Sequence, residues 1–181
     1  MSTVPGLPDG AEPRPAAGAS ESTPQVAGLD AVRARGEAAQ RSMAAFGGIV
    51  TVMMQSPAFQ HRSLSDLKDM VMPAVVTGQF WLAHARHKDS GEIRPIGAVL
   101  WASVSDEVDQ RLTADPNVAI RLQLDEWRSG ANLWIVEGIG ERTIVANLIR
   151  GLRQKDWQGQ AVKIKVRGQD GGPIVRLLPA A

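Results

Sequence analysis

The histidines are the first candidates for chemistry, because the sequence has only three of them and no cysteine. Histidine is the side chain whose ordinary pKa lies closest to neutrality, which suits a general base. His84 and His87 lie three residues apart at a predicted strand end, where positions i and i+2 share a face, so we predict no metal site there. His61 lies between Ser56-Pro57 and a predicted helix start at Ser63. An exposed imidazole can be held in one orientation there, although an ordinary loop histidine is the alternative.

Glu137 is the second candidate, because it interrupts an apolar run, residues 133–136, that is predicted to form a strand. A carboxylate at the end of such a strand can be half-buried, which raises its pKa or lets it orient a histidine. Alternation along the strand also allows Glu137 to face solvent. We expect Gly138 and Gly140 to break the strand and to expose backbone N–H groups to an anion or carbonyl oxygen. Their spacing matches no nucleotide-binding glycine motif.

The distribution of charge bears on possible partners. The net charge is only +1, which argues against a protein that coats nucleic acid. Residues 142–181, however, have eight basic and two acidic residues, or +6, which leaves −5 on residues 1–141. The basic segment is either a solvated surface or a docking face for an acidic partner, and charge alone does not separate the two. The lack of cysteine excludes disulfides, thiolate metal sites and an acyl-cysteine intermediate.

The composition divides the chain into a tail and one domain. Residues 1–28 are rich in proline and lack aromatic residues, which is typical of a disordered segment. We predict a disordered tail over residues 1–36 and a single domain over residues 37–181. No secretory signal and no transmembrane helix is expected, so the predicted location is the cytoplasm.

The pattern along the domain predicts an α+β (α/β) fold with one central, mostly antiparallel sheet. Asp30 is a candidate N-cap, and Ser63-Leu-Ser-Asp66 has the spacing of a capping box. Helices are predicted over residues 30–45 with a continuation through 49–54, after Ser63, from Ser105, and over 142–153. Strands are predicted over residues 79–85, 96–103, 133–136, 162–167 and 174–178, with a loop over 126–130.

An ordered series of short motifs connects this pattern to a known family. Each motif is weak alone, but together they resemble the RTX toxin-activating lysine acyltransferases, which fatty-acylate haemolysin-type protoxins. The resemblance covers about residues 47–172. The motifs are Ser56-Pro57, His61-Arg62, Leu64, Asp66-Leu67, Pro73-Ala74, Gln79, residues 95–107 (PIGAVLWASVSDE), residues 126–130 (EWRSG) and residues 134–137 (WIVE).

The resemblance implies a fold, a reaction and a set of partners. The fold is similar to that of the GCN5-related acetyltransferases. The donor is acyl carrier protein, whose phosphopantetheine thioester carries the acyl chain, and the acceptors are internal lysines of an RTX protoxin. The essential histidine and acidic residue of the family correspond to His61 and Glu137. A lysine amine is protonated at neutral pH, so a base must take a proton before the amine attacks a thioester.

Further residues receive roles through the same resemblance. Ser56 and Trp127 are candidates for substrate binding, although Trp127 is as well explained by packing. Gly138 and Gly140 are candidates to stabilise an oxyanion through their N–H groups. Acyl carrier proteins are strongly acidic, so the basic segment becomes a candidate docking face. Its predicted docking residues are Arg150, Arg153 and Lys155.

The sequence also departs from the family pattern. The acidic residue is glutamate where the family usually has aspartate, and Met70 stands where an asparagine is frequent. Aligned without a gap, Phe59 occupies the usual histidine position and His61 lies two residues later. These departures leave open a second hypothesis, a non-catalytic module that binds acyl carrier protein or an RTX protein. A general acyl-CoA acetyltransferase is disfavoured by the missing phosphate-binding loop, and a homodimer is left open.

Overall fold

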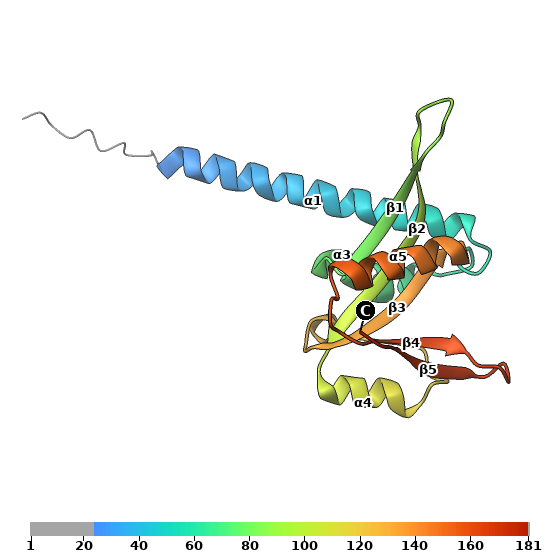
Figure 1. The fold of residues 1–181 in the computed structure, drawn as a ribbon. Helices are drawn as coiled ribbons and strands as arrows, with labels where there is room; N and C mark the ends of the chain where they lie inside the picture. Colours follow the sequence, from blue (N-terminus) through green and yellow to red (C-terminus); the bar gives the residue numbers. More distant parts are fainter. Residues whose placement is uncertain (1–23, 181) are drawn as a thin grey trace, which may run out of the picture. The chain divides into compact units, whose positions relative to one another are not determined.

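The computed structural model describes residues 24–180 and contains a five-stranded sheet that helices flank (Figure 1). The contacts divide the chain after Glu37, within the first helix, and the sheet belongs to the unit from Ala38 onward. The helical elements are α1 (Pro24–Gln55), α2 (Leu64–Asp66), the π-helical turn η1 (Leu67–Val71), α3 (Met72–Thr77), α4 (Asp106–Ala114), the 3-10 turn η2 (Leu124–Trp127) and α5 (Arg142–Lys155). The strands are β1 (Phe80–Arg86), β2 (Ile93–Val104), β3 (Asn132–Gly140), β4 (Val162–Arg167) and β5 (Pro173–Leu178).

The start of α1 differs from the prediction. The helix begins at Pro24, so Asp30 lies inside it and is not the N-cap. Residues 31–45 are rich in strong helix formers, and the helix extends beyond them toward the N-terminus. The predicted disordered tail, residues 1–36, therefore overlaps α1 from residue 24 onward. Residues 1–23 lie outside the described residues, and disorder there stays a prediction.

The predicted continuation of α1 past two glycines is confirmed, since the helix runs to Gln55. Gly48 is required by packing, because a Cβ atom there would lie 2.5 Å from Leu82 Cδ2 on β1. Gly47, its neighbour, has open space at the same position. The absence of a side chain at Gly48 thus lets the last turns of α1 lie against the sheet. Within residues 24–180, no helix has an apolar stretch that could span a bilayer.

The capping box is confirmed and starts the next helical segment. The Ser63 hydroxyl accepts a hydrogen bond from the Asp66 N–H, and the Asp66 carboxylate accepts one from the Ser63 N–H at 2.8 Å. The helix then widens into η1, which ends at Val71, two residues before Pro73 at the start of α3. Proline cannot donate a backbone hydrogen bond and restricts its predecessor, so a change of helical pitch there has a local cause.

The sheet has the order β1-β2-β3-β4-β5, and only the β3–β4 pair is parallel. The prediction of an α+β fold with one mostly antiparallel sheet is confirmed, and the architecture is compatible with a GCN5-related acetyltransferase-like fold. The parallel ladder is short: it joins Leu133–Ile135 of β3 to Val162–Ile164 of β4. Among residues 24–180, no strand pairs with the remaining residues of β3 on the β4 side, which leaves this edge of the strand open.

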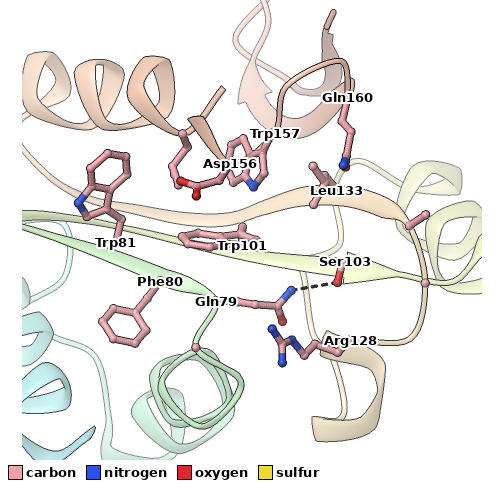
Figure 2. Close-up of a pocket in the computed structure, with 14 residues that line it drawn as sticks. Gln79, Phe80, Trp81, Trp101, Ser103, Arg128, Leu133, Asp156, Trp157 and Gln160 are labelled. Atoms are coloured by element: carbon pink, nitrogen blue, oxygen red, sulfur yellow. Dashed lines mark hydrogen bonds between the residues drawn. The ribbon is translucent and has the colours of Figure 1, made fainter. Parts of the chain in front are cut away.

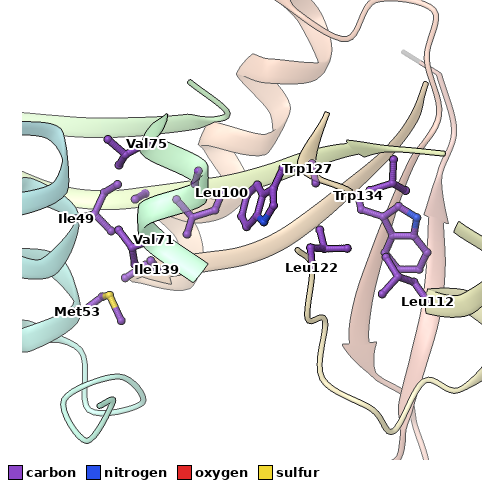
Figure 3. Close-up of a cluster of buried hydrophobic side chains, with 14 of the residues drawn as sticks. Ile49, Met53, Val71, Val75, Leu100, Leu112, Leu122, Trp127, Trp134 and Ile139 are labelled. Atoms are coloured by element: carbon purple, nitrogen blue, oxygen red, sulfur yellow. The ribbon is translucent and has the colours of Figure 1, made fainter. Parts of the chain in front are cut away.

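The two faces of the sheet bury two apolar clusters. Alternate residues of β2, such as Leu100 and Ala102, join the cluster under α1, η1, α3 and α4 (Figure 3). Val99 lies on the other face with residues of α5, such as Leu148 and Leu152. This alternation follows from strand geometry, in which successive side chains point to opposite faces. Trp134 is fully buried in the first cluster, as expected from its place in a strand.

The prediction that Gly138 and Gly140 break the strand is wrong. Both belong to β3, where Gly138 is paired with Val99 and Gly140 with Gly97 of β2. The glycines serve packing instead: a Cβ atom at Gly138 would lie 2.6 Å from Val145 Cγ1 of α5. Their lack of side chains lets neighbouring elements approach closely without ending the strand.

Gly140 has the strongest requirement for glycine in β3, and its replacement is expected to destabilise the fold. Its φ angle is +112°, and a Cβ atom would lie 2.8 Å from the Ile96 carbonyl oxygen. We expect Gly140→Ala to lower the free energy of unfolding by about 1–3 kcal/mol. The matched control, Gly47→Ala, replaces a helical glycine in open space and is expected to raise it by about 0.5–1 kcal/mol. Urea denaturation measures both, and equal effects would contradict this account.

Candidate active site

A bulge in β3 determines where the Glu137 side chain points. Leu100 of β2 is paired with Glu137, whereas the next residue, Trp101, is paired with Ile135, so Val136 is the extra residue. Because paired residues share a face, Glu137 lies on the face of Leu100, which is the face covered by α1 and α3. Regular alternation from Ile135 would have turned it toward α5 instead. Bulges commonly re-aim side chains in this way next to functional sites.

The Glu137 carboxylate is half-buried and has two neighbours. Its Oε1 atom accepts a hydrogen bond from the Gly138 N–H at 3.2 Å, and its Oε2 atom lies 3.9 Å from Arg62 Nη2. Burial raises the pKa of Glu137, because it disfavours the charged form more than the Gly138 N–H and the Arg62 guanidinium favour it. Of the two alternatives that the sequence left open for Glu137, the structure therefore fits the half-buried carboxylate with a raised pKa. A carboxylate of this kind is a better proton acceptor than an exposed one.

Arg62 connects Glu137 to the segment that carries His61. The guanidinium of Arg62 lies 3.9 Å from Asp66 Oδ1 as well as from Glu137, and 5.9 Å from the centre of the Phe59 ring. His61 is exposed and lies in the tight turn between α1 and α2, as the sequence predicted. In the described part of the chain, no hydrogen bond joins His61 to Glu137. Arg62, the residue after His61, is thus the contact between this turn and the Glu137 carboxylate.

Arg62 was missed as a candidate, although the His61-Arg62 pair was among the motifs of the family resemblance.

Phe59, at the usual histidine position in an ungapped alignment, is half-buried against the core cluster under α1 and α3. An apolar ring anchored in this way holds the turn and leaves the histidine two residues later on the surface. Met70, at the frequent asparagine position, also packs against that cluster. Both departures from the family pattern therefore add apolar contacts beside the site.

The other substrate-binding candidates have different surroundings. Ser56 is half-buried directly after α1, and its backbone carbonyl accepts hydrogen bonds from Phe59 N–H and Gln60 N–H at 2.8 and 3.2 Å. Ser56 therefore shapes the turn that carries His61. Trp127 is only 1% exposed and lies in the core, so it fits the packing alternative and cannot line a cleft in this conformation.

The open edge of β3 begins just before Glu137. The β3–β4 ladder ends at Ile135, and the Gly138 N–H, beyond that end, donates to the Glu137 side chain. A backbone donor and a carboxylate of raised pKa therefore lie together at this edge. Such a pair can accept a proton from an amine and donate a hydrogen bond to a carbonyl oxygen. The oxyanion role of Gly140 has no comparable support, because its close approach to Ile96 and Gly97 serves packing.

The predicted docking residues all lie on α5 but differ in availability. Arg150 and Lys155 are exposed, and Arg150 donates a hydrogen bond to Asn147, three residues earlier in the helix, at 3.1 Å. Arg153 is half-buried and donates to the Pro179 carbonyl oxygen at 2.5 Å. Arg153 is thus tied to the chain's C-terminal segment, which leaves Arg150 and Lys155 as the freer cations.

Two further cations of the basic segment have internal partners. Lys163 forms an ion pair with Asp109 of α4 at 2.6 Å, and Lys165 donates to the carbonyl oxygens of Asp115 and Val118 at 3.0 and 2.7 Å. These contacts hold the segment around α4 against β4. The net charge of +6 on residues 142–181 therefore exceeds the positive charge that is available on the surface to attract an acidic partner.

Comparison with known proteins identifies the family of this chain. The sequence profile described as the RTX toxin acyltransferase family matches residues 38–179, and the chain belongs to that family. It is an acyltransferase of the class that activates RTX toxins. The chain is similar to the RTX-II toxin-activating lysine-acyltransferase ApxIIC of Actinobacillus pleuropneumoniae, with 29% identity over 133 residues. The matched region covers 72% of this chain and 78% of that relative.

Proposed function

We propose that the protein transfers a fatty acyl chain from acyl carrier protein to internal lysines of an RTX protoxin, in the cytoplasm and before the toxin is exported. His61 is the general base and Glu137 is its acidic partner. The observation that carries this proposal is the bulge in β3, which turns a carboxylate of raised pKa toward the turn that contains His61. The family and the name of the similar relative support the same reaction.

The reaction needs the lysine amine in its neutral form. The entering ammonium replaces Arg62 beside Glu137, and His61 accepts the proton that the amine loses. The amine nitrogen then attacks the thioester carbonyl, forms the C–N bond of the amide and expels the phosphopantetheine thiol as the C–S bond breaks. As Glu137 turns to the ammonium it releases the Gly138 N–H, which then donates to the oxyanion of the tetrahedral intermediate. His61 passes this first proton to solvent, accepts the second proton from the nitrogen of the tetrahedral intermediate and delivers it to the leaving thiolate, so the amide keeps one N–H and the imidazole is neutral again after each turnover.

The surface of α5 and the loop before it favour acyl carrier protein over coenzyme A as the carrier of the acyl donor. Arg150 and Lys155 give the exposed side of this helix a positive charge, which complements a strongly acidic carrier protein. The β3–α5 junction lacks the glycine-rich loop that would bind the phosphates of coenzyme A. The test is acylation of a purified RTX protoxin with acyl-ACP or acyl-CoA of the same chain length. Faster transfer from acyl-ACP supports the proposal, and transfer from acyl-CoA alone contradicts it.

Removal of two exposed cations of α5 is expected to weaken donor binding. We expect the double variant Arg150→Ala/Lys155→Ala to raise the KM for acyl-ACP about tenfold, with kcat little changed, because rim charges act mainly on association. The matched control, Lys88→Ala/Arg94→Ala, removes two exposed cations near the β1–β2 turn and is expected to leave KM unchanged. Equal KM values for both double variants, or an effect that persists at high salt, would contradict docking on α5.

A second candidate function is a binding module without catalysis. It is favoured by the absence, in the described residues, of a contact between His61 and Glu137, together with Phe59 at the ungapped histidine position. This candidate predicts binding of acyl carrier protein or the protoxin but no transfer from any donor. The donor assay therefore separates the two candidates directly.

A further inference from the structure

A concave site lies on the face of the sheet opposite to the Glu137 side chain. It is a pocket of about 590 Å³ formed by the start of β1, the end of β2, the start of β3 and the end of α5 (Figure 2). Its walls include Trp101 and Leu133, which lie on the α5 face of the sheet. Glu137 points to the opposite face, so this pocket is separate from the candidate active site.

Gln79 provides the main sign that the pocket binds a ligand. Its side chain is 4% exposed and lines the pocket, and its Nε2 atom donates to Ser103 Oγ at 3.0 Å. Its Oε1 atom has no hydrogen-bond partner within the part of the chain that the structure describes. Buried polar atoms are nearly always hydrogen-bonded, and a small rotation of this amide, whose Oε1 atom is fully covered in the present conformation, would let it accept an N–H from a ligand in the pocket.

The rest of the wall is suited to a positive charge on an apolar stem. Trp101 and Trp157 pack edge to face, with ring centroids 5.4 Å apart, and Trp81 lines the same pocket. Figure 2 shows the Asp156 carboxylate beside Trp157 and above Trp101. Indole faces attract ammonium and guanidinium groups, and a neighbouring carboxylate adds to that attraction. A fatty acyl chain fits this wall poorly, because it offers nothing to Asp156 or Gln79.

The opposite end of the pocket has the opposite polarity. Arg128 is exposed and lies beside Gln79 in Figure 2, away from Asp156. A ligand with amide groups at one end and a cation at the other matches this arrangement. A polypeptide segment with a basic side chain has both, since its carbonyl oxygens can accept from Arg128 and its N–H groups can donate to Gln79.

We propose that this pocket binds a lysine or arginine side chain of the protein substrate, together with the adjoining backbone, as a recognition site separate from the lysine that is acylated. The basic group lies between Asp156 and the Trp101–Trp157 wall, and a backbone N–H donates to Gln79 Oε1. The identity of the ligand as the protein substrate rests on the proposed function. The pocket would then set which segment of a toxin is presented to the enzyme.

The test is titration of the full-length protein with Nα-acetyl-lysine N-methylamide and its arginine analogue, followed by tryptophan fluorescence. We expect a saturable change with at least one of them and none with the norleucine analogue, which keeps the stem without the ammonium. Asp156→Asn is expected to weaken binding about tenfold, as for loss of a charge-assisted contact. The matched control, Asp89→Asn, removes a carboxylate in the β1–β2 turn and is expected to bind as the unaltered protein does.

Equal binding of the norleucine compound, or no binding of either cation, would overturn the proposal. So would a saturable response to a long-chain fatty acid that Asp156→Asn leaves unchanged, because that would make the pocket an acyl site. In the transfer assay, Asp156→Asn is expected to raise the KM for protoxin with kcat unchanged. Cation binding by a protein that transfers no acyl group would instead contradict the proposed function and leave the pocket assignment intact.

Discussion

Replacement of His61 by alanine is expected to lower acyl transfer by about a hundredfold to ten-thousandfold, the range typical of a lost general base. His61 is exposed in the turn between α1 and α2, so its loss leaves the core unchanged and the protein folded. The reason for the effect is that protonated lysine cannot attack a thioester. Initial rates of protoxin acylation, with saturating acyl-ACP, measure it.

The matched control for this variant is His84→Ala, which removes an exposed histidine of β1. It is expected to keep the rate of the unaltered protein. The rate of His61→Ala is also expected to recover partly as pH rises, because more of the lysine then loses its proton to solvent. A His61→Ala protein as active as the His84→Ala protein at neutral pH would contradict the assignment of the base.

Replacement of Glu137 by glutamine is expected to change activity and stability in opposite directions. Transfer falls about a hundredfold or more, as when one preorganised electrostatic group is removed from an active site. The free energy of unfolding rises relative to the unaltered protein at neutral pH, because burial of the ionised carboxylate is costly and glutamine has no charge. Such a trade of stability for activity is common at functional sites.

The pH dependence gives the sign of the stability effect. The pKa of Glu137 in the folded protein lies above its ordinary value of 4.5, so the native state binds more protons than the unfolded state between the two values. The stabilisation that protonated Glu137 contributes is therefore complete below pH 4.5 and is lost as the pH rises through the raised pKa. The difference in unfolding free energy between Glu137→Gln and the unaltered protein is expected to grow over that interval and then level off.

Urea denaturation across this pH range measures the difference, and Glu137→Asp is the control. Aspartate keeps the charge, is the acidic residue usual in the family, and is expected to retain activity within about tenfold, since one methylene shifts the carboxylate by about one bond. A Glu137→Gln protein that transfers as fast as Glu137→Asp would show that the carboxylate has no part in the reaction.

The sequence predicted local structure well where a local signal existed. The capping pattern at Ser63 corresponds to a hydrogen-bonded capping box in the structure. The position of His61 between two helices followed from the proline after Ser56 and from that cap. The family resemblance identified the candidate pair because it combined several motifs that are weak alone.

The rest depended on contacts between distant segments. No signal in the sequence marks Val136 as a bulge residue, so alternation could not decide which face Glu137 occupies. The role of Gly138 and Gly140 was misread for a similar reason, since the neighbours that exclude side chains there come from α5 and β2. Charge counting failed at Lys163, because its ion pair with α4 spans residues far apart in the chain.

The central claim is that this protein acylates lysines of an RTX protoxin by using His61, and intact-mass analysis of a co-expressed protoxin tests it most directly. The toxin is expected to gain the mass of a fatty acyl group, fragmentation is expected to place the group on a lysine ε-amine, and the His61→Ala protein is expected to leave the toxin unmodified. A toxin without added mass, or one acylated equally by the His61→Ala protein, would contradict it.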